Sequence, residues 1–247
     1  MNNMTAPVIV LAGGFGTRLK SVVSDVPKPL APVEGHPFLE YLIEDLARQG
    51  VTRVVLSLHY QAEKFDEFIN KNSGRTNWPE ISRVIENEPL GTGGAVKHVL
   101  KSIGHDSSFF VTNGDTLTLG AIQKIREATD ERPINTIGLV KTSDPSRYGS
   151  VSTDETRNLV LGFKEKVAAS SKTGDQYVYA GTAFLTANDF ISTQKSIFSM
   201  ENDLFPALIR KNKLHYTELE GEFIDIGIPK DYFAFPEWFR RQGLRLE

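Results

Sequence analysis

Three glycines and two basic residues follow one another near the start of the chain. Gly13, Gly14 and Gly16 come directly after an apolar run, and glycine lets the backbone turn its N–H groups toward an anion. Arg18 follows, and then Lys28 between two prolines that keep the segment extended. A guanidinium can bind phosphate oxygens in pairs and an ammonium acts as a mobile point charge, so the pattern suits a polyphosphate. The alternative is a tight turn with two solvated cations.

The glycine spacing differs from that of two common phosphate-binding loops. Leu19 stands where a dinucleotide-binding loop has its third glycine, and no Gly-Lys-Ser/Thr sequence closes a P-loop. We therefore expect another kind of anion site.

Two carboxylates lie where a site of an α/β protein would need them. Asp115 follows the apolar run 109–113, at the carboxyl end of an expected strand. Asp225 lies between Ile224 and Ile226, so strand alternation could direct its side chain into a cleft. The alternatives are a helix N-cap for Asp115 and an exposed strand position for Asp225.

The sequence shows two different patterns in the segments that must position these residues. Apolar runs rich in valine and isoleucine alternate with segments of helical periodicity up to residue 143, and they predict strands at 8–12, 53–57, 109–113 and 134–140 and helices at 38–49, 61–70, 93–101 and 119–129. This alternation predicts an α/β fold with a Rossmann-like, mixed but mainly parallel sheet flanked by helices, and ligands at the carboxyl ends of its strands.

From residue 144 on, strand-like pieces are linked by polar turns without regular helical crossovers. They predict strands at 148–153, 160–164 and 178–185 in a small antiparallel lobe. No linker-like segment separates the parts of the chain with these two patterns. We therefore expect one domain over residues 1–247, in which the lobe packs onto the first sheet.

The composition excludes several classes of protein. The chain has 247 residues, 40% of them hydrophobic and 24% charged, which is typical of a globular protein. No apolar run approaches the roughly 18 residues of a membrane span, and no signal peptide is visible, so we expect a cytoplasmic protein without membrane contact. The absence of cysteine excludes disulfides and thiolate metal sites, and the net charge of −3 argues against nucleic-acid binding.

Several segments match, in order, the motifs of one known family. They are 11–19 with 27–29, 86–94, 113–115, 147–149, 163–166, 179–181 and 223–227. On these segments the chain resembles the sugar-1-phosphate nucleotidylyltransferases. The runs 21–27 and 37–39 look most like the members that act on D-glycero-α-D-manno-heptose 1-phosphate with GTP, and the mannose-1-phosphate guanylyltransferases are close relatives.

The resemblance implies a reaction and a set of site residues. A sugar phosphate oxygen attacks the α-phosphorus of an NTP in line and pyrophosphate leaves, with Mg²⁺ on Asp115 and Asp225. It implies catalytic roles for Arg18, Lys28, Asp115 and Lys166. The implied nucleotide-binding residues are Leu11, Ala12, Gly13, Gly14, Gly16, Thr17, Arg18, Lys28, Glu86, Gly91, Thr92, Asn113 and Gly114. Those implied for the sugar phosphate are Tyr148, Gly149, Glu165, Lys166, Tyr179 and Gly181.

The same resemblance divides the chain into a nucleotide-binding part, 1–143, and a part with the sugar-binding lobe and C-terminal helix, 144–247. The expected partners are GTP, or another NTP, and a sugar 1-phosphate, bound by a monomer or a homodimer. A uridylyl-, cytidylyl- or thymidylyltransferase, a transferase of phosphorylated headgroups and a nucleotide-sugar sensor are the alternatives. The sensor is disfavoured because Lys28, Asp115 and Asp225 are all present.

The predictions of the nucleotide base and of the sugar each depend on a single residue. Glu86 stands at the family's base-reading position, and a carboxylate can accept from guanine N1–H and N2–H together, which favours GTP. The alternative is an exposed Glu86, with backbone amides selecting the base. Tyr179 stands where the family often has asparagine, which leaves the sugar open.

Two features near the C-terminus have simpler interpretations. Glu201 and Asp203 are expected to cap a helix over 204–211. The aromatic residues of 232–239 are expected to form a core or subunit-contact face.

Overall fold

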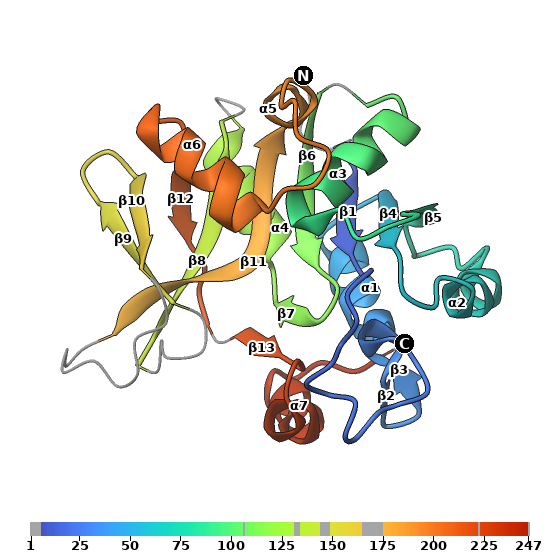
Figure 1. Cartoon of the computed structure of the whole chain (residues 1–247). Helices are drawn as coiled ribbons and strands as arrows, with labels where there is room; N and C mark the ends of the chain where they lie inside the picture. The colour runs from blue at the N-terminus through green and yellow to red at the C-terminus, as the bar shows by residue number, and fades with distance from the viewer. Residues whose placement is uncertain are drawn as a thin grey trace.

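A nine-stranded sheet crosses the molecule, with helices on both of its faces (Figure 1). The computed structural model describes residues 6–105, 107–130, 134–143, 149–164, 175–221 and 223–246. The order of the strands across the sheet is β5-β4-β1-β6-β11-β8-β12-β10-β9. Their bounds are β1 Val8–Leu11, β4 Arg53–Leu58, β5 Glu80–Ile85, β6 Ser108–Asn113, β8 Thr136–Thr142, β9 Ser150–Asp154, β10 Leu159–Lys164, β11 Gln176–Thr186 and β12 His215–Glu218.

The sheet is mixed, as predicted, but it is not mainly parallel. Strands β5, β4, β1 and β6 are parallel, as helical crossovers require. The long strand β11 then lies between β6 and β8 and runs antiparallel to both. Strand β12 is parallel to β8, and β10 is antiparallel to β12 and β9. The expected antiparallel strands therefore extend the first sheet instead of packing onto it.

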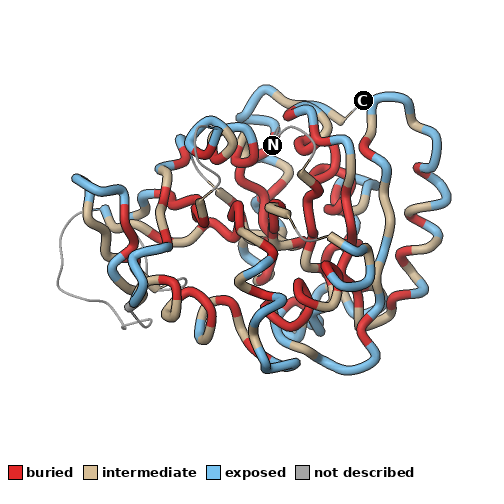
Figure 2. Tube along the Cα trace, turned by 90° about the horizontal axis from the view of Figure 1, so that it is seen from above, coloured by how far each residue is buried: buried red, intermediate tan, exposed pale blue. Residues whose placement is uncertain are grey.

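Alternation along the strands builds one hydrophobic core on each face. Val8 and Val10 of β1 belong to one core with α1 (Phe38–Arg48), α2 (Lys64–Asn72), α4 (Ala121–Thr129) and α7 (Pro229–Arg241). Ile9 faces the second core with α3 (Gly91–Ser102), α5 (Ala187–Ile191) and α6 (Phe205–Arg210). Figure 2 shows the buried residues concentrated along the central strands. The sheet is thus rigidly held from both sides.

Most of the expected elements occur at the expected places, with ends that differ by a few residues. The short or polar strands β5, an edge strand with no buried residue, and β12 were missed, as was the two-stranded pair β2 (Pro32–Val33) with β3 (His36–Pro37). The pairing of β7 (Thr116–Thr118) with β13 (Phe223–Asp225) was also missed. The expected strand start at Tyr148 lies outside the described residues.

The C-terminal helix α7 returns the chain to its N-terminal part. Phe235 packs edge-on against Phe38 and Tyr41 of α1, with ring centroids 5.0 Å apart in each case. Phe235, Trp238 and Phe239 are buried, whereas Phe233 is 66% exposed. Most of the aromatic face is therefore core. None of the helices in the described ranges has the length and apolar character needed to cross a bilayer.

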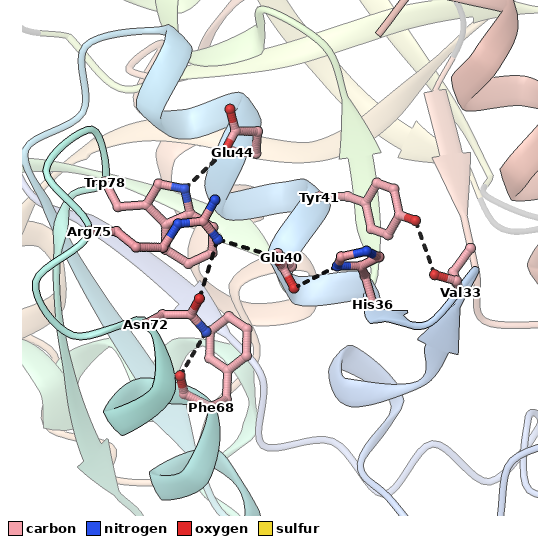
Figure 3. Close-up of polar contacts among 9 residues, drawn as sticks. All are labelled: Val33, His36, Glu40, Tyr41, Glu44, Phe68, Asn72, Arg75 and Trp78. Carbon is pink, nitrogen blue, oxygen red and sulfur yellow. Dashed lines mark hydrogen bonds and ion pairs between the residues drawn. The ribbon is translucent and has the colours of Figure 1, made fainter. Parts of the chain in front are cut away.

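Helix α1 also buries acidic side chains, and these fasten the loop that precedes β5 (Figure 3). Glu40 accepts from Nη1 of Arg75 at 3.1 Å and lies 3.2 Å from Nδ1 of His36. Glu44 accepts from Nε1 of Trp78 at 2.8 Å, and the Arg75 guanidinium stacks 4.1 Å from the Trp78 ring. Each buried carboxylate has a partner, so this network supports the fold rather than a site.

Candidate active site

A cavity of about 340 Å³ opens at the carboxyl ends of β1, β4 and β6. The register brings these ends together, because Leu11 pairs with Ser57 on one side and Asn113 on the other. The cavity is lined by Leu11, Gly13, Gly14, Phe15, Ser57, His59, Glu86, Pro89, Leu90, Gly91, Thr92, Ala95, Asn113 and Asp115. It lies where an α/β sheet is expected to bind its ligand.

The cavity gathers residues that lie far apart in the sequence. Eight of the residues implied by the resemblance line it: Leu11, Gly13, Gly14, Glu86, Gly91, Thr92, Asn113 and Asp115. Ala12, Gly16, Thr17, Arg18, Lys28 and Gly114 lie outside its lining. Sequence reasoning missed the lining residues Phe15, Ser57, His59, Pro89, Leu90 and Ala95. The parallel order of β1 and β4 was the signal that could have indicated Ser57 and His59.

The glycine loop packs tightly against its neighbours. Gly13 leaves little space for a side chain, because a β-carbon there would lie 3.0 Å from the backbone N of His59. Gly16 adopts a left-handed conformation, with φ of +58°. The loop is thus held close to the ends of β1 and β4, as a cradle for an anion requires.

Glu86 is buried at the wall of the cavity, which contradicts the alternative of an exposed residue. Only 7% of its surface is exposed. Its Oε1 accepts from the Ser57 hydroxyl at 3.1 Å, and its Oε2 accepts from the backbone N–H of Leu90 at 3.1 Å. Each carboxylate oxygen has a further lone pair, so Glu86 can accept two more hydrogen bonds from a ligand.

Asp115 lines the cavity and directly precedes β7, and Asp225 ends β13, the strand that pairs with β7 (Figure 1). Asp225 of β13 pairs with Thr116 of β7, and Ile226 N–H donates to the Asp115 carbonyl at 3.0 Å. Asp115 is not the N-cap of the following helix, because that position belongs to Gly120. The missed β7–β13 pair is therefore the element that brings the two acids together.

The two basic side chains predicted to bind phosphate, those of Arg18 and Lys28, lie beside these carboxylates. Lys28 Nζ is 2.5 Å from Asp115 Oδ2, and the Lys28 side chain is only 11% exposed. A β-carbon on Gly227 would lie 2.6 Å from Asp225 Oδ1, 3.2 Å from Lys28 Nζ and 3.3 Å from an Arg18 Nη2. The ammonium, the guanidinium and both carboxylates therefore converge around Gly227, and a side chain at Gly227 would displace them.

The two carboxylates suit a divalent cation that would also bind the phosphates of the substrate. Within the described ranges, no group of three or more His, Cys, Asp or Glu side chains could hold a metal ion by itself. Mg²⁺ usually takes one or two carboxylates, keeps waters and shares phosphate oxygens. Asp115 and Asp225 supply that donor set, and the Lys28 ammonium beside them shows that the place accepts positive charge.

The residues implied for the sugar phosphate are only partly described. Tyr148, Glu165 and Lys166 lie outside the described residues. Gly149 and Gly181 both have positive φ, and a β-carbon on Gly181 would lie 2.7 Å from Asn113 Nδ2. Gly181 therefore makes room for a cavity side chain.

Tyr179 does not present its hydroxyl to solvent. The hydroxyl is buried without a hydrogen-bond partner among the described residues, and the ring packs edge-on against Phe205. Burial, with a smaller effect of Glu201, raises the pKa of Tyr179 well above its usual range.

Comparison with known proteins gives consistent matches over most of the chain. The sequence model of the nucleotidyl transferase family matches residues 7–238. The D-glycero-alpha-D-manno-heptose 1-phosphate guanylyltransferase of Campylobacter jejuni is 37% identical over 227 residues, 92% of this chain and 97% of that protein. The enzyme of the same name from Aneurinibacillus thermoaerophilus is 36% identical, over 91% of this chain and 94% of that protein.

A solved structure of a related protein is also similar to this chain. The crystal structure of HddC from Yersinia pseudotuberculosis complexed with GMP-PN is similar with a TM-score of 0.80 and 38% identity. The match covers 95% of this chain and 100% of that one.

Proposed function

The chain belongs to the nucleotidyl transferase family, and we propose that it transfers GMP from GTP to D-glycero-α-D-manno-heptose 1-phosphate and releases pyrophosphate. The full-length similarity to heptose 1-phosphate guanylyltransferases supports the sugar and the nucleotide together. Within the site, the observation that carries the proposal is the buried carboxylate of Glu86 on the cavity wall.

Glu86 supports guanine as the base. Ser57 and Leu90 each donate to a different oxygen of its carboxylate, which fixes the orientation of the group. The remaining lone pairs suit the adjacent N1–H and N2–H donors of guanine, whereas uracil offers one donor between two acceptors. A half-paired buried carboxylate costs about 1–3 kcal/mol, which is enough for a preference.

The cations and the loop support the binding of a triphosphate. Arg18 and Lys28 converge at the acid pair, and Gly13 and Gly14 of the glycine loop line the cavity together with Asp115. In our proposal Lys28 exchanges Asp115 for phosphate oxygens when the nucleotide binds, and Arg18 holds the pyrophosphate that leaves. Lys166 and Glu165 bind the phosphate and the hydroxyls of the sugar.

The reaction requires alignment more than covalent catalysis. A phosphate oxygen of the sugar forms a bond to the α-phosphorus of GTP, and the bond from that phosphorus to the β-phosphate bridging oxygen breaks. The pyrophosphate takes the electron pair. Asp115 and Asp225 would hold Mg²⁺, which stabilises the charge that develops on the phosphate oxygens. The protein holds two anions in line and offsets their repulsion.

A substrate screen tests this function. The protein is incubated with Mg²⁺, each of the four NTPs and the 1-phosphate of heptose, mannose or glucose, and pyrophosphate release is measured. We expect the highest kcat/KM for GTP with the heptose 1-phosphate. Release with mannose 1-phosphate alone would reassign the sugar, and preference for another NTP would refute the role of Glu86. Nucleotide binding without release under any condition would favour a sensor.

A further inference from the structure

One segment from the C-terminal part of the chain packs against α3, the helix that begins at the cavity. Residues 193–204, which we call the strap, run along α3 and end in a π-helical turn, Met200–Leu204. The buried Lys97 of α3 donates to the carbonyls of Thr193 and Lys195. The Phe198 carbonyl accepts from the N–H groups of Gly93 and Gly94, at 2.9 and 3.1 Å. The strap thus caps the first turn of α3.

The glycines of this turn fit the strap and not a ligand. A β-carbon on Gly93 would lie 2.2 Å from the Phe198 ring, and one on Gly94 would lie 2.3 Å from the Ser196 carbonyl oxygen. One on Gly91 would lie 2.7 Å from the Phe198 carbonyl oxygen. The strap can approach α3 this closely only because these side chains are absent.

Glu201 holds the one polar side chain of this turn. The Thr92 hydroxyl donates to Glu201 Oε2 at 2.8 Å and accepts from the Met200 N–H at 2.8 Å. The Ser199 hydroxyl donates to the same oxygen of Glu201, also at 2.8 Å. The donating capacity of Thr92 is therefore used within the protein, although Thr92 lines the cavity.

These contacts leave two backbone donors for a ligand. Of the first N–H groups of α3, those of Gly93 and Gly94 bond to the strap, and that of Leu90 just before the helix bonds to Glu86. The N–H groups of Gly91 and Thr92 have no hydrogen-bond partner in the described part of the chain, and both residues line the cavity. The place of these two donors depends on how the strap holds Thr92.

We propose that Glu201 is a positioning residue for the nucleotide: through the Thr92 hydroxyl it sets the first turn of α3, and with it the Gly91 and Thr92 N–H groups that face the bound nucleotide. This inference rests on the proposed function, since it concerns the same cavity. It gives Glu201 a role that helix capping does not include, because its carboxylate bonds to α3 rather than to the N-terminus of α6.

Asp203 separates positioning from simple packing of the strap. It lies in the same π-helical turn and accepts from the Ser199 N–H at 2.9 Å and from Lys195 Nζ at 2.7 Å. None of its hydrogen bonds reaches Thr92 or α3. Replacing Asp203 with alanine therefore loosens the strap without removing the hydrogen bond that we assign to positioning.

The experiment compares E201A, E201Q, T92V, the double variant T92V/E201A and D203A. The dissociation constant of GTP is measured by calorimetry without sugar phosphate, and KM is then measured for both substrates. E201A and T92V should each weaken GTP binding by about tenfold, as the loss of the hydrogen bond that positions the two N–H donors implies. The double variant should be no weaker than either single one.

The remaining variants should behave differently. In E201Q one amide oxygen can accept from both hydroxyls, since both now bond to Oε2, so GTP affinity should stay within about twofold of the wild type. D203A should also stay within about twofold, and KM for the sugar phosphate should change little in every variant.

Two results would overturn the inference. The first is GTP affinity in T92V and E201A equal to that of the wild type. The second is a loss in D203A as large as in E201A, which would mean general loosening of the strap. A wild-type protein that binds another NTP is tested with that NTP, so failure of the base assignment is seen separately. T92V retains Glu201 and keeps the test decisive even where E201A does not fold.

Discussion

At the scale of single residues, the proposed preference for guanine depends on which hydrogen bonds Glu86 can still accept. The side chain is buried, and its two oxygens already bond to Ser57 and Leu90. A glutamine at this position can keep its oxygen toward the Leu90 N–H and turn its amide toward the Ser57 hydroxyl, which can also accept. The E86Q change therefore alters the ligand-facing acceptors while keeping the protein contacts.

We expect E86Q to reduce the ratio of kcat/KM for GTP over UTP by about tenfold or more, because an amide offers one acceptor fewer to guanine. Pyrophosphate release with each nucleotide measures the ratio. The thermal unfolding midpoint should change little and serves as the control. An unchanged GTP to UTP ratio would mean that backbone groups select the base.

The residues of the site could be predicted only in part from the sequence. The glycine loop, Lys28 and the two acids have distinctive types and spacing, and the structure brings them together. Ser57 and His59 were not predicted as site residues, because a serine and a histidine at the end of a strand have no local signature. Their place follows only from the pairing of β4 with β1.

At the scale of elements, a buried acid joins α1 to α4. Asp45 accepts from Gln49 Nε2 at 2.6 Å and from the Gly120 N–H at 3.4 Å, just before α4. Burial is the main reason that the pKa of Asp45 is raised to about 7. Between pH 4 and 7 the unfolded chain loses this proton while the folded chain keeps it, so the folded state loses stability as the pH rises and levels off above 7.

D45N should remove this dependence. We expect the free energy of unfolding of the wild type, minus that of D45N, to fall from pH 4 to 7, with a slope of at most about 1.4 kcal/mol per pH unit for one proton. Urea unfolding at several pH values measures it. A constant offset is expected as well, because the asparagine amide meets Gln49 Nε2, so only the slope is diagnostic. A flat difference would mean that Asp45 is charged in the fold.

The first turn of α3 gives a second prediction at this scale. In G93A the new methyl group would meet the Phe198 ring, so we expect a loss of about 1–3 kcal/mol in the free energy of unfolding, despite the better helix propensity of alanine. The matched control is G162A, where the nearest atom is 3.5 Å away. The double variant G93A/F198A should be less destabilised than the sum of its single changes. Additive effects would show that the two residues do not meet.

The elements themselves were predictable where periodicity was strong. The four buried strands and four helices of the first part appear close to their expected ranges. Strand direction was not predictable after β8, because β11 follows a hairpin and enters the sheet between β6 and β8 without a helical crossover. The short β7–β13 pair has no local signal, since its partners lie about a hundred residues apart.

At the scale of the whole molecule, one sheet connects the two expected parts. Strand β11 pairs with β6 of the first part and with β9 of the second, and α7 packs on α1. We therefore expect a single cooperative unfolding transition. Fluorescence of Trp78 and Trp238 and circular dichroism at helical wavelengths should give the same midpoint in urea. Separate midpoints would show that residues 1–143 and 144–247 unfold as two domains.

We propose that Asp115, directly before β7, and Asp225, at the end of the paired strand β13, hold one divalent ion against the phosphates of the nucleotide. The most direct measurement is a crystal structure with Mn²⁺ and a non-hydrolysable GTP analogue, in which anomalous scattering locates the metal. We predict a peak bonded to both carboxylates and to phosphate oxygens, with Lys28 moved from Asp115 to the phosphates. A nucleotide bound in the cavity with no metal shared by Asp115 and Asp225 would contradict the account.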